Sequence, residues 1–154
     1  MKKLLVFWVA ILFVASVGVA SAQDKGTAAE AKALVKKGVA YMKEVGKDKA
    51  LAEFANPKGM FIYKDLYIYA TAMDGTNLAH PYTPAMTGKN YINLKDADGK
   101  LFVKETIELA KDKGGGDYVY RWTHPKTKKV EKKHVYVEAV PGMDLILTCG
   151  YYGE

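Results

Sequence analysis

The chain has 154 residues, of which 49% are hydrophobic and 26% charged, and it carries a net charge of +6 at neutral pH. That length suits a single domain with a substantial core. Nucleic-acid-binding proteins usually concentrate their basic residues in one stripe. Here the lysines are spread along the chain, apart from a cluster at 126–133, and there is one Arg. We therefore expect no nucleic-acid partner.

The first 22 residues have the layout of a secretory signal peptide. Two lysines precede an almost unbroken apolar run from Leu4 to Val19, and Ala20-Ser21-Ala22 provides a small-residue cleavage site. The alternative is an uncleaved membrane anchor, although a span needs about 20 apolar residues and this run is short. Cleavage leaves one domain, residues 23–154, and predicts a periplasmic or secreted protein.

Two helices are predicted at the start of this domain. Apolar residues recur at helical spacing from Thr27 to Val45, with lysines around the remaining surface, and Gly46 marks the end. Asp48 is expected to cap a second, short helix that ends before Asn56-Pro57. The first helix is long and amphipathic, so it has one face to pack on a sheet.

The segment from Leu66 to Tyr82 predicts two strands joined at Asp74-Gly75, which is a strong hairpin signal. Counting outward from these two turn residues gives the opposed pairs Met73–Thr76, Tyr69–His80 and Tyr67–Tyr82. Opposed residues share a face of the sheet, so three phenols and an imidazole are predicted to form one patch. Such a patch can grip a small polar ligand, but it contains no evident nucleophile.

The rest of the chain predicts a long loop, a helix and three strands. Residues 81–99 are rich in Pro, Gly, Asn and Asp, and long loops of this kind often form lids. A helix is predicted over 100–113, before the glycine run at 114–116, and strands over 117–123, 131–140 and 143–151. Because three successive strands are joined by hairpins, we expect an antiparallel sheet and an α+β fold.

The motifs that would indicate an enzyme are absent from the sequence. It has no P-loop, dinucleotide fingerprint, HExxH or GxSxG motif, and no Ser follows Ala22, which excludes serine hydrolase chemistry. The three His residues and Cys149 lack metal-ligand spacing, and the acidic stretch at 96–99 lacks the rest of an EF-hand loop. We therefore expect neither a metal nor a cofactor, and Cys149 is predicted to be a buried, inert thiol.

Several short motifs, taken in order along residues 28–151, resemble those of the single Cache domain family. They are Ala50-Leu51-x-x-Phe54, Asp74-Gly75-Thr76-x-Leu78-Ala79-His80-Pro81, Gly88-Lys89-Asn90, Asp96-x-Asp98-Gly99-Lys100-x-Phe102, Tyr120-x-Trp122, Lys133-x-x-Tyr136-Val137 and Gly150-Tyr151. The resemblance implies a PAS-like extracytoplasmic sensor domain, in which a long N-terminal helix packs on an antiparallel sheet and the ligand pocket lies on the other face. Similar domains bind small carboxylates.

This resemblance and the side-chain chemistry together suggest seven ligand-binding residues: His80, Tyr120, Trp122, Lys133, Tyr136, Tyr69 and Tyr82. Lys133 is expected to supply positive charge to a carboxylate. Tyr120, Tyr136 and His80 are expected to donate hydrogen bonds, and Trp122 to form an apolar wall.

Lys133 and Tyr136 present a difficulty, because residues three apart on a regular strand point to opposite faces. They share a pocket only if the strand bulges or bends. If the strand is regular, we expect Lys133 rather than Tyr136 to lie outside the pocket, with Arg121 or backbone amides meeting the anion.

These inferences predict an exported binding or sensing domain for a small carboxylate, not an enzyme. Family receptors continue into a transmembrane helix and a signalling module, whereas this sequence stops at Glu154. We therefore expect a free periplasmic binder that acts through a membrane receptor or histidine kinase, as a homodimer formed through its N-terminal helix. One alternative is a small periplasmic enzyme with His80 as general base, oriented by Asp74. The other is a structural or interaction protein with a filled pocket.

Overall fold

The computed structural model describes residues 25–153, so the predicted signal peptide lies outside the described residues. The helices are α1 (Ala28–Val45), α2 (Lys47–Phe54), the short 3-10 helix η1 (Pro84–Met86) and α3 (Phe102–Lys113). The strands are β1 (Ile62–Tyr63), β2 (Leu66–Ala72), β3 (Asn77–Ala79), β4 (Gly115–Thr123), β5 (Val130–Ala139) and β6 (Leu145–Tyr151). Within residues 25–153, no helix combines the length and the apolar character needed to span a membrane.

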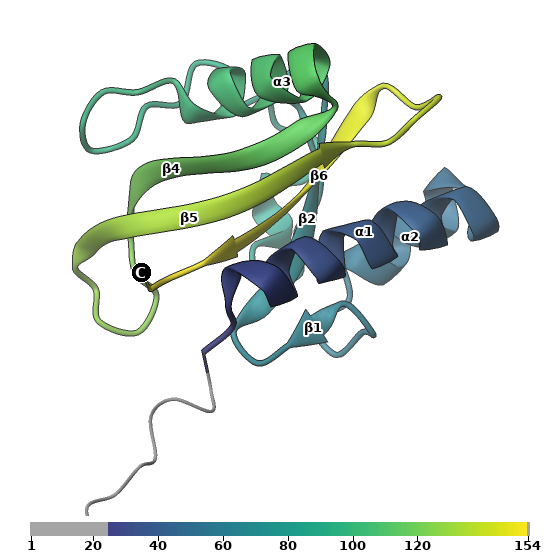
Figure 1. Ribbon diagram of the computed structural model, residues 1–154, viewed down its shortest axis with the longest axis horizontal. Coiled ribbons are helices and arrows are strands. Elements are labelled where there is room, and N and C mark those ends of the chain that lie inside the picture. Colours follow the sequence, from purple (N-terminus) through teal and green to yellow (C-terminus); the bar gives the residue numbers. More distant parts are fainter. Residues whose placement is uncertain (1–24, 154) are drawn as a thin grey trace, which may run out of the picture.

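An antiparallel sheet forms the middle layer, in the order β1-β2-β6-β5-β4, and β3 also pairs with β2. Helix α1 packs on one face of this sheet, against β2, β5 and β6, and α2 lies beside α1 (Figure 1). Helix α3 covers part of the other face, over β4 and β5. This is the predicted α+β, PAS-like arrangement, with a long N-terminal helix on an antiparallel sheet.

Helix α1 begins at a capping box, which fixes where the chain enters the domain. The Thr27 hydroxyl accepts from the Glu30 N–H, and the Glu30 carboxylate accepts from the Thr27 N–H. Gly38 lets the helix approach the sheet closely, since a Cβ there would lie 2.5 Å from Ile68 Cδ1. The apolar face of α1 therefore seals one side of the sheet and leaves the other side for the site.

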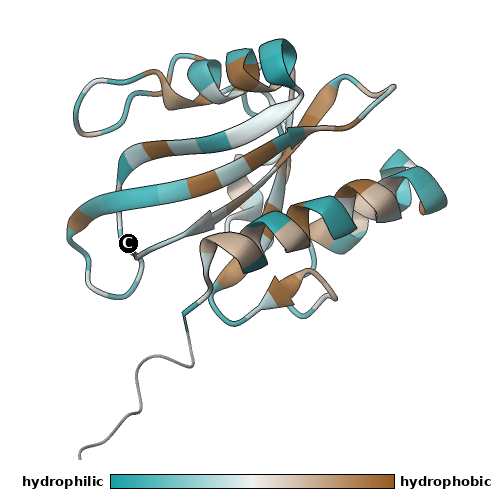
Figure 2. Cartoon of the chain, in the orientation of Figure 1, coloured by the Kyte–Doolittle hydropathy of each residue, from teal (hydrophilic) through white to brown (hydrophobic). Residues whose placement is uncertain are grey.

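The pairing between β4, β5 and β6 is regular, so alternate residues of each strand face opposite layers. Figure 2 shows hydrophobic bands separated by hydrophilic ones along β4 and β5, without a continuous apolar run in either strand. Val135 and Val137 pack on the α3 side, whereas Tyr136 belongs to the core cluster under α1. Lys133 has the same parity as the two valines and therefore points to the α3 side.

The hairpin between β2 and β3 differs from the prediction close to its turn. Ala70 pairs with Ala79, as the predicted register requires, but a bulge makes Thr71 pair with Asn77. The predicted Met73–Thr76 pair is therefore wrong. The bulge lies between the turn and the aromatic residues, so it does not disturb the aromatic patch.

Two smaller expectations also need correction. The residue at the N-cap of α2 is Gly46, with φ of 87°, and Asp48 lies inside the first turn instead of capping it. The two-residue strand β1 was not predicted, because a strand this short has no periodicity to detect.

Candidate ligand-binding site

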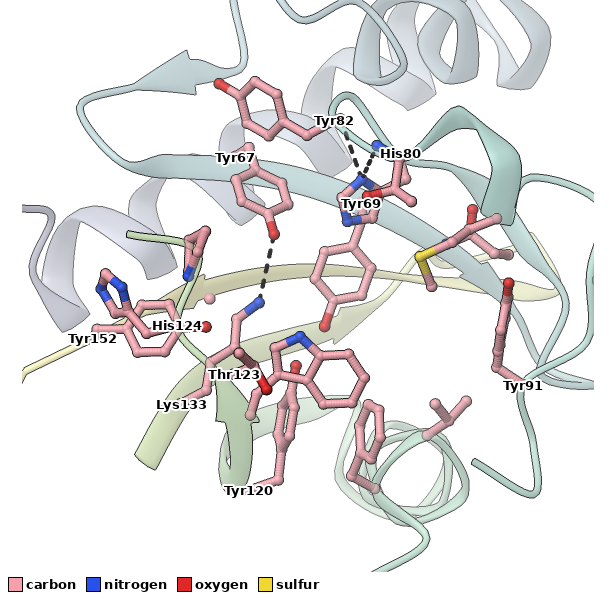
Figure 3. A pocket seen from close by; sticks show the side chains of 18 of the residues that line it. Tyr67, Tyr69, His80, Tyr82, Tyr91, Tyr120, Thr123, His124, Lys133 and Tyr152 are labelled. Atoms are coloured by element: carbon pink, nitrogen blue, oxygen red, sulfur yellow. Dashed lines mark hydrogen bonds between the residues drawn. The ribbon is translucent and has the colours of Figure 1, made fainter. Parts of the chain in front are cut away.

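A cavity of about 720 Å³ lies on the face of the sheet opposite α1. Residues of β2, β4, β5 and β6 form one wall, and the 81–99 segment and the start of α3 form the other (Figure 3). Six of the seven predicted residues line it: Tyr69, His80, Tyr82, Tyr120, Trp122 and Lys133. An open cavity of this size argues against the alternative of a filled, purely structural pocket.

Lys133 lies in the middle of the site, with its side chain lying over Gly150. A Cβ at position 150 would lie 2.4 Å from Lys133 Cε, so only glycine leaves room for the lysine side chain in this position. Lys133 is 6% exposed, and its Nζ lies 3.5 Å from Tyr67 Oη. The centroids of the Tyr67, Tyr69 and Tyr152 rings lie 5.6, 6.0 and 5.7 Å from Nζ, within cation–π range.

Lys133 has no ionic partner in the part of the chain described: no carboxylate there lies within 4.0 Å of Nζ. Burial lowers the pKa of the ammonium, because the charged form loses its hydration. A buried cation without a counter-charge is costly, and a bound anion would offset that cost. The electrostatics of the cavity therefore favour a negatively charged ligand.

His80 is held as a neutral imidazole by its own turn. Its Nδ1 accepts from the backbone N–H groups of Tyr82 and Thr83, at 3.2 and 3.0 Å. Burial, together with the positive charge of Lys133, lowers the pKa of His80 to about 4. With Nδ1 engaged as an acceptor, the proton lies on Nε2, which becomes a hydrogen-bond donor.

The geometry required of His80 as a general base is not present. An orienting carboxylate would accept a hydrogen bond from Nδ1–H, but Nδ1 here accepts hydrogen bonds from two backbone N–H groups instead. Asp74 Oδ1 accepts from the Thr76 N–H at 2.8 Å, inside its own turn. The expectation that Asp74 orients His80 is therefore wrong.

The phenols around Lys133 are also kept protonated. Burial raises the pKa of Tyr67 to about 12, and it raises the pKa values of Tyr69 and Tyr120 as well. His80 stacks on Tyr69 with ring centroids 5.8 Å apart, and the Tyr67 and Tyr82 rings are 5.1 Å apart. The predicted aromatic patch is confirmed, and at neutral pH the Tyr67 and Tyr69 hydroxyls remain able to donate hydrogen bonds.

Tyr136 does not line the cavity. Strand β5 has no bulge, so Tyr136 faces α1, where its hydroxyl donates to Glu138 at 3.0 Å and its ring lies 5.2 Å from Lys32 Nζ. The expectation that a regular strand would leave Lys133 outside the pocket and Tyr136 within it is therefore wrong, because Lys133 is the residue that lines the cavity. Arg121 is likewise not among the lining residues, and its Nε lies 3.9 Å from Asp98 Oδ1.

Several lining residues were missed by the sequence reasoning, and three of them had a usable signal. Tyr67 lies on the same hairpin face as Tyr69 and belongs to the predicted aromatic patch, but it is not among the seven predicted ligand-binding residues. Tyr152 extends the alternation of β6 by two residues beyond Gly150. His124 begins a His-Pro-x-Thr sequence like that of His80, and its Nδ1 likewise accepts two backbone N–H groups, at 3.0 and 3.2 Å.

Comparison with known proteins places this architecture in a family. Residues 8–154 match the family described as single Cache domain 2. The chain belongs to that family. Cache domains are extracytoplasmic sensor domains of chemotaxis proteins and histidine kinases, and the predicted resemblance is confirmed.

Three relatives are informative about this Cache domain. It superposes on a methyl-accepting chemotaxis protein of Vibrio parahaemolyticus with a TM-score of 0.68 and 27% identity, covering 80% of this chain and 86% of the other. A Cache chemosensory domain studied for carboxylic acid recognition gives 0.64 and 25%, with coverage of 80% and 86%. The sensor histidine kinase MctS of Rhizobium johnstonii is 33% identical over 89 residues, 58% of this chain but 19% of the kinase.

Proposed function

We propose that the protein is an extracytoplasmic sensing domain that binds a small carboxylate reversibly. The observation that carries this proposal is the buried Lys133 ammonium, which lies in an open cavity without a carboxylate within 4.0 Å in residues 25–153. The similar Cache domain studied for carboxylic acid recognition supports the same ligand class.

The surrounding groups suit a carboxylate, which accepts hydrogen bonds and donates none. Lys133 supplies the charge, and the Tyr67, Tyr69 and Tyr120 hydroxyls and His80 Nε2–H supply neutral donors. Charge-assisted hydrogen bonds of this kind are stronger than neutral ones. Among the described residues that line the cavity there is no Ser or Cys nucleophile, which supports binding rather than catalysis.

We further propose that the liganded state is passed to a membrane receptor or histidine kinase, from a periplasmic or secreted location after signal-peptide cleavage. A homodimer through α1 is the assembly we propose. Kinase and chemoreceptor relatives support the signalling context.

A thermal-shift screen against acetate, propionate, lactate and pyruvate tests the ligand class. A ligand that binds the folded state raises the melting temperature, by mass action. Protein that has been unfolded and refolded to remove any ligand should respond to at least one acid at millimolar concentration. No response to any of them, with the refolded protein intact by circular dichroism, would overturn the proposal.

A further inference from the structure

The two halves of the cavity differ in chemistry. Around Lys133 the lining groups are polar, whereas the part of the wall formed by the 81–99 segment and the start of α3 is mainly apolar. The apolar lining consists of Met86, Leu94, Phe102, Val103 and the ring of Trp122. In Figure 3, Tyr91 marks one end of the cavity, and Tyr152 with His124 marks the other.

The apolar half begins directly beside the charged half. Tyr120 is the cross-strand neighbour of Lys133, and its ring stacks on Phe102 with centroids 4.2 Å apart and planes 10° apart. The Trp122 ring meets Phe102 edge-on at 5.4 Å. A ligand whose carboxylate reaches Lys133 therefore has an aromatic wall next to its carbon chain.

The cavity is much larger than a short acid. A water molecule occupies about 30 Å³ of liquid, and taking the same space for each heavy atom gives about 180 Å³ for an acid of six heavy atoms. That is roughly a quarter of the 720 Å³ present. A two- or three-carbon acid would leave the apolar half of the cavity, around Phe102, filled by water. Water makes few hydrogen bonds with an apolar lining.

We propose that the ligand is a monocarboxylate bearing an apolar group of about ring size, such as a medium-chain or arylalkanoic acid. This inference rests on the proposed function, since it assigns the carboxylate to Lys133. The apolar group lies against Phe102, Trp122, Met86 and Leu94, and of these Leu94 and Trp122 pack in one cluster with Phe102.

The apolar half is bounded at its far end, which sets a limit on ligand length. Thr71 lies two residues beyond Tyr69 on β2, about 7 Å further along the strand, and it pairs with Asn77. Both residues line the cavity and are almost fully buried, at 6% and 3% exposed. Affinity should therefore rise with chain length and then fall when the chain reaches these polar side chains.

Isothermal titration calorimetry of the purified protein with acetate, butyrate, hexanoate, decanoate and phenylacetate tests this inference. Each methylene buried in the apolar half should tighten binding by up to about fourfold. Hexanoate and phenylacetate should bind at least tenfold more tightly than acetate, and decanoate more weakly than hexanoate. Affinity that is greatest for acetate and falls with every added carbon would overturn the inference while leaving carboxylate binding intact. Failure of all the acids would overturn the proposed function as well.

Leu94→Trp fills the apolar half from the 81–99 segment, and it should lower the phenylacetate-to-acetate affinity ratio at least tenfold. Lys95→Trp is the matched control, because the neighbouring Lys95 is exposed and does not line the cavity. If the Trp variant does not fold, Leu94→Ala should lower the same ratio by removing contact area. An unchanged ratio in a folded Leu94 variant would contradict the assignment of the apolar half.

Discussion

Replacing Lys133 by Met should weaken carboxylate binding and at the same time stabilise the empty protein. Methionine is similar in length to lysine but carries no charge, so it nearly fills the space that the Lys133 side chain occupies. A hydrogen bond to a charged group contributes about 1.5–3 kcal/mol, which corresponds to a roughly 10- to 150-fold loss of affinity.

The effect on stability has the opposite sign. Burial lowers the pKa of Lys133 below its unfolded value of 10.5, so the unfolded chain holds this proton more tightly than the folded one. The charged lysine therefore destabilises the fold at neutral pH. Its removal should stabilise the ligand-free protein by about 1 kcal/mol, or raise its melting temperature by about 4 °C for a domain of this size.

Calorimetric titration with propionate and thermal unfolding without ligand measure the two effects separately. Lys132→Met is the control, because Lys132 is exposed on the same strand and points to the opposite face. Undiminished affinity in Lys133→Met would refute the assignment of the anion to this residue. A variant that loses both stability and binding would show that Lys133 is a structural residue.

Three further predictions concern neighbouring residues. Because the folded pKa of His80 is about 4 and its unfolded value is 6.5, stability should fall by about 2 kcal/mol between pH 6.5 and 4, after allowance for solvent screening. His80→Asn, whose oxygen can accept the same N–H groups, should remove this loss from urea unfolding curves; an unaltered pH profile would count against it. Gly150→Ala should displace the lysine side chain and weaken propionate binding several-fold, whereas Gly116→Ala should not; equal affinities would contradict this. Tyr136→Phe should leave propionate affinity within about twofold, and a larger loss would place Tyr136 at the site.

The fold could be predicted well because its elements have strong local signals. The 3.6-residue period of α1 and the alternation of Tyr118, Tyr120 and Trp122 depend only on neighbouring residues. The bulge at Thr71 could not be predicted, because the turn residues favour a tight two-residue hairpin. The bulge depends instead on longer-range contacts of the turn, where a Cβ at Gly75 would lie 2.7 Å from Ile92 Cβ.

The site was predicted in composition but not in its internal geometry. Strand parity correctly separated Lys133 from Tyr136, yet it could not show which face carried the cavity. That choice depends on where α1 packs, which is a tertiary contact. It also depends on the space over Gly150 that the Lys133 side chain occupies. No periodicity in the sequence indicates that Lys133 lies against a glycine of the neighbouring strand.

The central claim, that the cavity binds a carboxylate through charge, is tested most directly by comparing propionate with propionamide by isothermal titration calorimetry. The two molecules have nearly the same size and shape, but only the acid is anionic. We predict that propionate binds at least tenfold more tightly than propionamide. Equal affinities for the two, or binding of propionamide alone, would contradict it.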